Sequence, residues 1–186
     1  MVQKFCWLHG AERVIAVDYI DYRLMHAEKY NQVETVNFEQ HHNTGEYLRE
    51  ITHGGADIVI DCVGMDGKMT PMEFVGSGLK LQSGALGAFV MAAQAVRKGG
   101  MIQVTGVYGG RYNAFPFGDI FSRNINIRTG QAPVIPYMPR LYNLLAEEKV
   151  DPSDIITHRL PLEDAAHGYE AFDTKTEDCI KVVLKP

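Results

Sequence analysis

Val14-Ile15-Ala16-Val17-Asp18 is the stretch that decides the fold, because four apolar residues end there in a carboxylate. The apolar run predicts a strand over residues 14–17. Residues 3–9 before it predict the end of a helix, and Gly10 is the C-cap that turns the chain into the strand. Residues 21–30 after it predict another helix. Asp18 therefore stands where a strand ends and the chain turns toward a helix.

The same alternation continues along the chain and predicts an α/β protein with a parallel sheet covered by helices. Residues 56–64, Ala-Asp-Ile-Val-Ile-Asp-Cys-Val-Gly, are apolar enough for a strand buried on both faces. A loop over residues 65–82 follows, and a loop with three prolines lies near residues 133–139. The other predicted strands cover 35–38, 101–105, 125–129, 155–160 and 180–184, and the other predicted helices cover 45–53, 85–98 and 140–148, with one more starting at Pro161.

Composition limits the classes of function. The chain has 186 residues, 46% of them hydrophobic, and a net charge of -5, which favours one main domain and excludes a polyanion-binding footprint. We expect no nucleic acid as partner. We expect no membrane either, since no apolar run approaches the roughly 20 residues of a spanning helix, and the first residues do not form a signal peptide. A cytoplasmic location follows, with Cys6, Cys62 and Cys179 reduced, because they are too far apart for a disulfide framework or a metal pair.

The position of Asp18 suggests a ligand. In a dinucleotide-binding βαβ unit, the acid that binds the adenosine ribose ends the second strand, about 20 residues after a glycine-rich phosphate loop. Counting back from Asp18 passes Met1, and Gly10 is already a helix cap. The 186 residues therefore predict an incomplete Rossmann-type, doubly wound parallel sheet that lacks its first strand. The alternative is an aspartate that only ends a strand or caps a helix.

An ordered set of short motifs carries a family resemblance over nearly the whole chain. The set is Gly10 to Asp18, Gly55-Ala56-Asp57 through Asp61-Cys62-Val63-Gly64, Val96 to Gly100 leading to Gly106-Val107, Leu160 to Ala165, and Cys179 to Leu184. In this order they resemble the zinc-type alcohol dehydrogenases of the medium-chain dehydrogenase/reductase superfamily. Residues 65–82 are similar to the insertion of the formaldehyde-dehydrogenase-like branch.

The resemblance implies NAD as cofactor and gives roles to residues that match. Asp18 would accept hydrogen bonds from both ribose hydroxyls and disfavour NADP, and Arg23 could lie over the adenine. Turn glycines, a solvated arginine and a solvated lysine are the competing interpretations. The cofactor-binding residues implied are Asp18, Arg23, Val63 and Gly64 at the adenosine and nicotinamide side, Gly106 and Val107 beside the nicotinamide ribose, and Lys181 at the pyrophosphate.

Departures from the family limit what the chain can do. No residue matches the family's zinc ligands, and the isolated pair His41-His42 is more simply solvated, so we expect no zinc, no other metal and no catalytic residue. Without the phosphate loop, NAD binding should be weak or lost. The main hypothesis is a truncated alcohol or formaldehyde dehydrogenase-like oxidoreductase, inactive alone. Residues 1–150 would be the remaining dinucleotide-binding domain, and residues 151–186 a C-terminal tail that normally packs on the absent catalytic domain. The substrate remains open, because most of its pocket lies in that absent part.

A missing first strand also predicts association. Sheet order in this architecture is 3-2-1-4-5-6, so its loss exposes two strands in the centre of the sheet. We expect a homodimer or larger assembly. The resemblance gives a second reason, because dimers of the family pair the strand that corresponds to residues 125–129 across a twofold axis. The alternative function is a non-catalytic binding or assembly module that pairs with itself or with a full-length homologue. A methyltransferase-like domain, in which an acid also binds a ribose, fits residues 57–64 and 101–106 less well.

Overall fold

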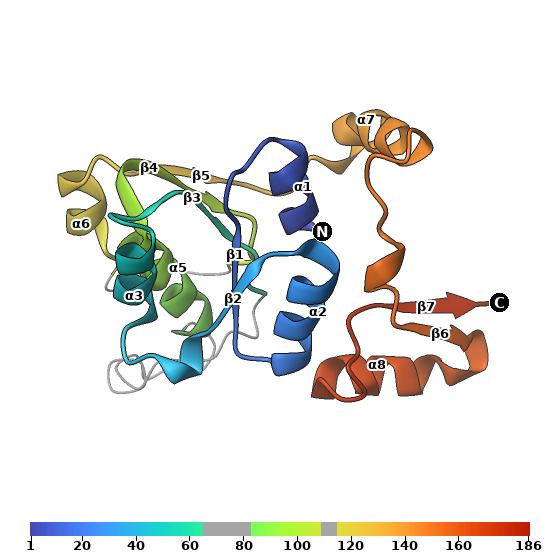
Figure 1. Cartoon of the computed structure of the whole chain (residues 1–186). Coiled ribbons are helices and arrows are strands. Elements are labelled where there is room, and N and C mark those ends of the chain that lie inside the picture. The colour runs from blue at the N-terminus through green and yellow to red at the C-terminus, as the bar shows by residue number, and fades with distance from the viewer. Residues whose placement is uncertain (65–82, 109–114) are drawn as a thin grey trace. The chain divides into compact units, whose positions relative to one another are not determined.

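The computed structural model describes residues 1–64, 83–108 and 115–186, and it divides into two compact units. The first unit joins Met1–Gln40 to Val134–Pro186, and the second is His41–Pro133. Both combine helices with parallel strands (Figure 1), which confirms the α/β class. A division at residue 150 into a domain and a tail is not tested by these units and stays a prediction.

In the first unit, the predicted helix–strand–helix segment is confirmed. Helix α1 (Val2–Leu8) leads to β1 (Ile15–Asp18), which is followed by α2 (Asp21–Asn31) and β2 (Glu34–Asn37). Strands β1 and β2 are parallel, with Asp18 opposite Asn37. Leu24 and Ala27 of α2 are buried. A short 3-10 helix, η1 (Phe38–Gln40), ends this part of the unit.

The rest of the first unit is the C-terminal segment. Helix α7 (Val134–Ala146) comes first, and a parallel pair formed by β6 (His158–Pro161) and β7 (Val182–Lys185) carries α8 (Ala165–Thr174) on one side. Gly168 allows this packing, because a Cβ there would lie 3.0 Å from Val182 Cγ1. The short 3-10 helices η2 (Ser153–Ile155) and η3 (Leu162–Asp164) lie before and after β6.

The second unit contains a three-stranded parallel sheet in the order β3-β4-β5. Its core is formed by α5, β4, α6 and Ile125, and Val96 and Ile102 are fully buried. In chain order its elements are α3 (Thr44–Ile51), β3 (Ala56–Asp61), α5 (Ser83–Ala95), β4 (Val96–Val104), α6 (Phe117–Ser122) and β5 (Asn126–Thr129).

The strand order agrees with the expected sheet. In the general strand order 3-2-1-4-5-6, removal of strand 1 leaves a two-stranded group, 3-2, and a three-stranded group, 4-5-6. The described residues form these groups as β1-β2 and β3-β4-β5, all parallel. The incomplete Rossmann-type sheet is therefore the fold of this chain.

Several predicted boundaries were wrong. The strand predicted over residues 155–160 begins at His158, and the helix predicted from Pro161 begins at Ala165 after η3. The largest displacements are at the starts of β4 and α7.

The helix expected over residues 85–98 ends at Ala95, and β4 begins at Val96. The strand starts this early because it pairs with β3 on both sides of an irregularity. Ala56 lies opposite Val96, and Ile58 lies opposite Met101. Gly99, with φ +69°, lies within this irregular stretch. A pattern of alternating apolar residues does not reveal such a bulge.

The proline-containing segment was also misassigned, since the helix expected from residue 140 begins at Val134. Pro136 is the third residue of α7, where a backbone N–H has no acceptor within the helix, so a proline there costs little. Pro139 lies inside the helix. The loop expected over residues 65–82 lies outside the described residues. Across those that are described, no helix has both the length and the apolar character needed to cross a membrane.

Candidate functional site

Asp18 closes β1 as the sequence predicts, and its two carboxylate oxygens have different surroundings. Oδ1 accepts hydrogen bonds from the backbone N–H groups of Tyr19 at 2.7 Å and Ile20 at 3.2 Å. Oδ2 faces the guanidinium of Arg23, with 3.8 Å between Oδ2 and Nη1. The side chain of Asp18 is 29% exposed. One oxygen is thus used to turn the chain from strand to helix, while the other has a loose ion pair with Arg23.

Arg23 lies in the first turn of α2, where its backbone N–H donates to the carbonyl of Ile20. Its guanidinium carbon is 5.9 Å from the centre of the Tyr22 ring, and the side chain is 34% exposed. A weak cation–π contact and a 3.8 Å ion pair hold the group loosely. The structure therefore brings Arg23 beside Asp18, and its place over an adenine stays a prediction.

A second cluster lies in the other unit, where β3 and β4 end side by side. Asp61 is 5% exposed, and its Oδ1 accepts from the Val63 N–H at 2.9 Å. Its Oδ2 accepts a hydrogen bond from the Tyr108 hydroxyl. Its carbonyl accepts from the N–H of Gly106 at 3.0 Å. A buried carboxylate that is bonded on both oxygens holds the two strand ends together. We call Asp61, Val63, Gly106, Val107 and Tyr108 the strand-end corner.

Gly106 is the most constrained residue of the strand-end corner. A Cβ there would lie 2.5 Å from the carbonyl oxygen of Val63 and 3.2 Å from both carboxylate oxygens of Asp61. The requirement for glycine therefore comes from the close approach of the two strand ends. Gly64 differs, since nothing lies within 4 Å of the place where its Cβ would be.

The structure thus brings together three of the predicted residues, Val63, Gly106 and Val107. The Val107 N–H donates to the Val63 carbonyl at 3.0 Å, and the Val107 side chain is 52% exposed. An exposed valine beside crowded backbone could contact a flat ligand. Binding of the nicotinamide ribose there is untested by the geometry.

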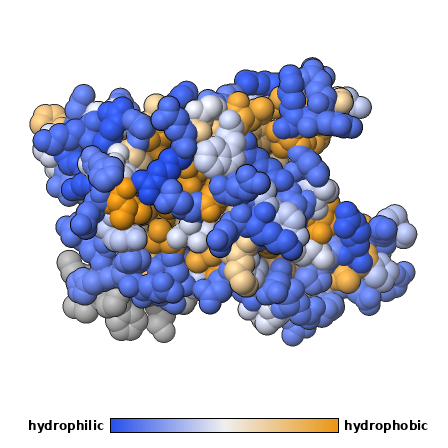
Figure 2. Space-filling model, in the orientation of Figure 1, coloured by the Kyte–Doolittle hydropathy of each residue, from blue (hydrophilic) through white to orange (hydrophobic). Residues whose placement is uncertain are grey.

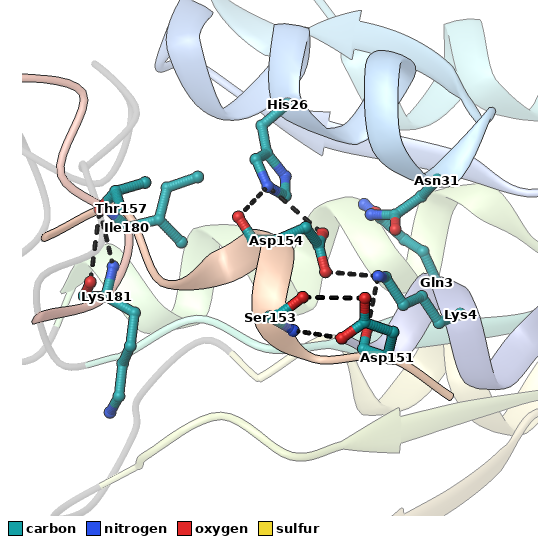
Figure 3. Close-up of polar contacts among 10 residues, drawn as sticks. All are labelled: Gln3, Lys4, His26, Asn31, Asp151, Ser153, Asp154, Thr157, Ile180 and Lys181. Carbon is teal, nitrogen blue, oxygen red and sulfur yellow. Dashed lines mark hydrogen bonds and ion pairs between the residues drawn. The ribbon is translucent and has the colours of Figure 1, made fainter. Parts of the chain in front are cut away.

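Lys181 lies in the C-terminal segment just before β7. Its carbonyl accepts from the N–H groups of Thr157 at 3.1 Å and His158 at 3.2 Å, and the Thr157 hydroxyl accepts from the Lys181 N–H at 3.4 Å. Its side chain is exposed and extends away from the other residues in Figure 3. The backbone of Lys181 therefore has a structural role, and contact of its ammonium with a pyrophosphate stays a prediction.

Figure 3 also shows a polar cluster that sequence reasoning missed. Asp154 of η2 is paired with Lys4 of α1, and its carboxylate lies 3.4 Å from His26 Nε2 of α2. Lys4 also donates to the Asp151 carbonyl at 2.7 Å. These contacts join the C-terminal segment to the N-terminal helices. Nothing in the local pattern signals them, because Lys4 and Asp154 are 150 residues apart.

Asp61 and Tyr108 were missed as site residues, although the sequence held a signal for Asp61. It is a carboxylate that directly follows the apolar run Ile58-Val59-Ile60 at the end of β3, and a buried charge needs partners. As for metals, the described part of the chain has no group of three His, Cys, Asp or Glu side chains placed to hold an ion.

The strand order and the acid at the end of β1 define the class of this protein: it has the Rossmann-like architecture of the NAD-binding half of alcohol dehydrogenases. An alcohol dehydrogenase from Thermus sp. ATN1 superposes with a TM-score of 0.80 at 28% identity, over 98% of this chain and 47% of that one. A further NAD-dependent alcohol dehydrogenase gives 0.72 at 26% identity, over 99% of this chain and 46% of that one.

Sequence comparisons identify the family. The family model described as zinc-binding dehydrogenase matches residues 1–72. The zinc-type alcohol dehydrogenase-like protein AdhB of Bacillus subtilis is 67% identical over 184 residues, which are 99% of this chain and 49% of AdhB. A probable zinc-binding alcohol dehydrogenase of Mycobacterium tuberculosis is 30% identical over 98% of this chain and 41% of its own length. The chain belongs to the zinc-type alcohol dehydrogenase-like family, and it spans about half the length of these relatives.

Proposed function

We propose that this chain supplies the NAD-binding part of a zinc-type alcohol dehydrogenase-like oxidoreductase, and that the 186 residues alone bind NAD weakly and oxidise no alcohol. The observation that carries the proposal is the carboxylate of Asp18 at the end of β1. The Asp18 side chain is 29% exposed, and among the described residues its Oδ2 is held only by a 3.8 Å contact with Arg23. A ribose with two adjacent hydroxyls could donate to this oxygen without displacing a strong partner.

Weak binding follows from what these residues supply around a dinucleotide. The pyrophosphate normally lies on a helix N-terminus behind a glycine-rich loop, which neutralises its charge. No such loop precedes Asp18 in the 186 residues, and the acidic balance of the chain repels a dianion. The ribose contact alone is a few hydrogen bonds to a charged group, each worth about 1.5–3 kcal/mol.

Inactivity follows from the same comparison. NAD accepts a hydride when bound, but a zinc-dependent alcohol dehydrogenase also needs a metal with an open position to polarise the alkoxide. No residue of this chain matches the family's ligand positions. The 186 residues would therefore contribute coenzyme recognition, and the substrate and its chemistry would lie with residues outside them.

An NADH titration tests the proposal, with energy transfer from Trp7 as the readout and calorimetry as the check. Asp18→Asn keeps an oxygen for the turn while removing the charge, so it should abolish the NADH signal and leave the fold unchanged. The control is Asp21→Asn, three residues along the same turn. Saturable binding lost only in Asp18→Asn would support the proposal. No binding at millimolar NADH, or equal loss in both variants, would refute the coenzyme role.

We also propose a second function, assembly, on a separate observation. Among the described strands, β5 pairs on one side only, with β4, so its other edge is unpaired. All four residues of β5 are exposed, including the apolar Ile127, which is 37% exposed. An exposed edge strand is a template for pairing with another chain. In the first unit, α7 buries none of its residues, and Ile135 and Tyr142 are 85% and 71% exposed. Figure 2 shows apolar atoms among hydrophilic ones over α7.

Assembly would take the form of a homodimer, or of pairing with a full-length homologue. Light scattering behind a sizing column measures it directly across a range of concentrations. Ile127→Lys should shift the chain to monomer, whereas Tyr169→Lys on α8, which removes another exposed apolar side chain, should not. A monomer at every concentration that also fails to co-purify with a longer relative would exclude this function.

A further inference from the structure

The second unit contains a hollow of about 370 Å³ that shares no lining residue with the strand-end corner. It lies where α3 and α6 end and where β4 begins, at the amino-terminal edge of the sheet. The strand-end corner is at the opposite, carboxyl edge. The lining residues are Arg49, His53, Gly54, Gly55, Arg97, Lys98 and Arg123.

The charge of this hollow stands out against the rest of the chain. Four of the 18 Lys and Arg residues line it, and no Asp or Glu does, in a protein whose net charge is -5. Two carboxylates lie close by. Asp57 accepts from Arg97 Nε at 2.6 Å, and its side chain is 81% exposed. Asp119 of α6 acts electrostatically on Arg123. Even with both carboxylates counted, the four cations leave the hollow a surplus of positive charge.

All three guanidinium groups that line the hollow donate to backbone carbonyls. Arg97 Nη1 donates to the carbonyl of Lys98 at 2.9 Å. Arg49 Nε donates to the carbonyl of Gln94 at 2.7 Å, and Arg123 Nη1 donates to the carbonyl of Ala93 at 2.5 Å. Arg123 Nη2 donates to the Val96 carbonyl. These contacts order the arginines before any ligand arrives and leave the terminal nitrogens of Arg49 without a protein acceptor in the part of the chain that is described. Preorganised donors of this kind favour a planar or tetrahedral oxyanion.

Two further features concern the positive charge of the hollow. Lys98 is exposed, and its ammonium has no hydrogen bond or ion pair with any described residue. Burial lowers the pKa of Arg123 and the nearby positive charge of Arg49 lowers it further, while the negative charge of Asp119 opposes both effects in part. An anion placed between these groups would relieve that repulsion.

The backbone leaves room for a ligand. Gly54 and Gly55 line the hollow with φ of +122° and +117°. A Cβ on Gly55 would lie 2.5 Å from the backbone nitrogen of Arg97, so this turn is seated directly against β4. Nothing lies within 4 Å of a Cβ on Gly54, so its side of the hollow is open.

We propose that this hollow binds a phosphate group, either free phosphate or the phosphoryl group of a small metabolite. The competing explanation is that the cations only neutralise the carbonyls at the ends of α3, α5 and α6. That explanation accounts for the hydrogen bonds of Arg49 and Arg123. It leaves Lys98 without a role, because the Lys98 ammonium bonds to no carbonyl among the described residues.

Calorimetric titration of the whole chain with inorganic phosphate tests the proposal, with sodium chloride at matched ionic strength as the blank. We expect saturable binding with a dissociation constant of about 1 mM, which corresponds to a binding free energy of about -4 kcal/mol. Glycerol 3-phosphate in a second titration distinguishes the sources: tighter binding than phosphate indicates a phosphorylated metabolite, and weaker binding indicates the free ion.

Lys98→Gln should weaken phosphate binding about twofold to fivefold, as expected for the loss of one solvent-exposed charge pair. Lys185→Gln, an exposed lysine on β7, is the matched control and should leave the affinity unchanged. Asp18→Asn should also leave it unchanged, which separates this site from coenzyme binding. Equal affinity in Lys98→Gln and the unsubstituted chain, or a signal reproduced by chloride, would overturn the proposal.

Discussion

Gly106→Ala should destabilise the second unit, whereas Gly64→Ala should not. Both glycines were predicted to line a ligand site, and both follow the end of a strand. Only Gly106 is crowded: an added Cβ would meet the Val63 carbonyl oxygen at 2.5 Å and the Asp61 carboxylate at 3.2 Å. At Gly64 an added Cβ would meet nothing within 4 Å.

The magnitude follows from what has to move. The Val63 oxygen belongs to the backbone, and it already accepts from the Val107 N–H at 3.0 Å, so it cannot swing aside without breaking that bond. Overpacking a rigid contact costs about 1–3 kcal/mol, and a lost hydrogen bond about 1 kcal/mol more. We expect Gly106→Ala to lower the free energy of unfolding by about 2–4 kcal/mol. Gly64→Ala should stay within about 0.5 kcal/mol of the parent chain.

Urea unfolding followed by far-ultraviolet circular dichroism measures the difference. With a slope of about 2 kcal/mol per molar urea, Gly106→Ala should lower the midpoint of its transition by about 1–2 M. Because the chain has two compact units, tyrosine fluorescence should be recorded in parallel to detect separate transitions. Equal shifts of the midpoint in both variants, or an unchanged midpoint in Gly106→Ala, would contradict the crowding at Gly106.

Two further predictions concern the first unit and the cysteines. Asp154→Asn should lower the free energy of unfolding by about 1–3 kcal/mol in the same urea assay, because it leaves the mostly buried ammonium of Lys4 without its anion. Asp164→Asn, at the exposed end of η3, should be neutral, and equal effects of the two substitutions would contradict the pairing of Asp154 with Lys4. Burial raises the pKa of the Cys6 thiol, so at about pH 8 less of it is thiolate than usual, and iodoacetamide should alkylate the exposed Cys62 first. Mass spectrometry over time gives the order, and equal rates would contradict it.

The sequence predicted the order of elements because each strand is a short apolar run bounded by a turn signal. Gly10 before β1 and Asp18 at its end located that strand, and Gly54-Gly55 located the start of β3. The start of β4 was missed because its pairing with β3 depends on a bulge, which is a property of two strands together. The start of α7 was missed because three prolines suggested a loop, and a proline in the first turn of a helix is tolerated.

Residues of the candidate site were predictable where one residue type has one strong geometric reason. Asp18 is an acid at the end of β1, Gly106 follows the end of β4, and both lie where the sequence placed them. The partners that support them were not predictable. Tyr108 donates to Asp61 across 47 residues, and Arg49 reaches Gln94 across 45. Contacts of this kind depend on how the elements pack, which no single stretch of sequence contains.

Exposed apolar residues on the two sheets indicate where a further strand would be accommodated. In a 3-2-1-4-5-6 sheet, the strands corresponding to β1 and β3 both neighbour the first strand. Here β1 pairs only with β2, and β3 only with β4, within the described residues. Val17 on β1 is 36% exposed and Ile58 on β3 is 54% exposed, although both lie in apolar runs typical of buried strands. Water on such residues costs about 25 cal/mol for each Å² left uncovered, so a strand supplied to either edge would be stabilised by apolar burial as well as by hydrogen bonds. This is the physical reason to expect that the chain functions with a partner, whether a second copy or a longer relative.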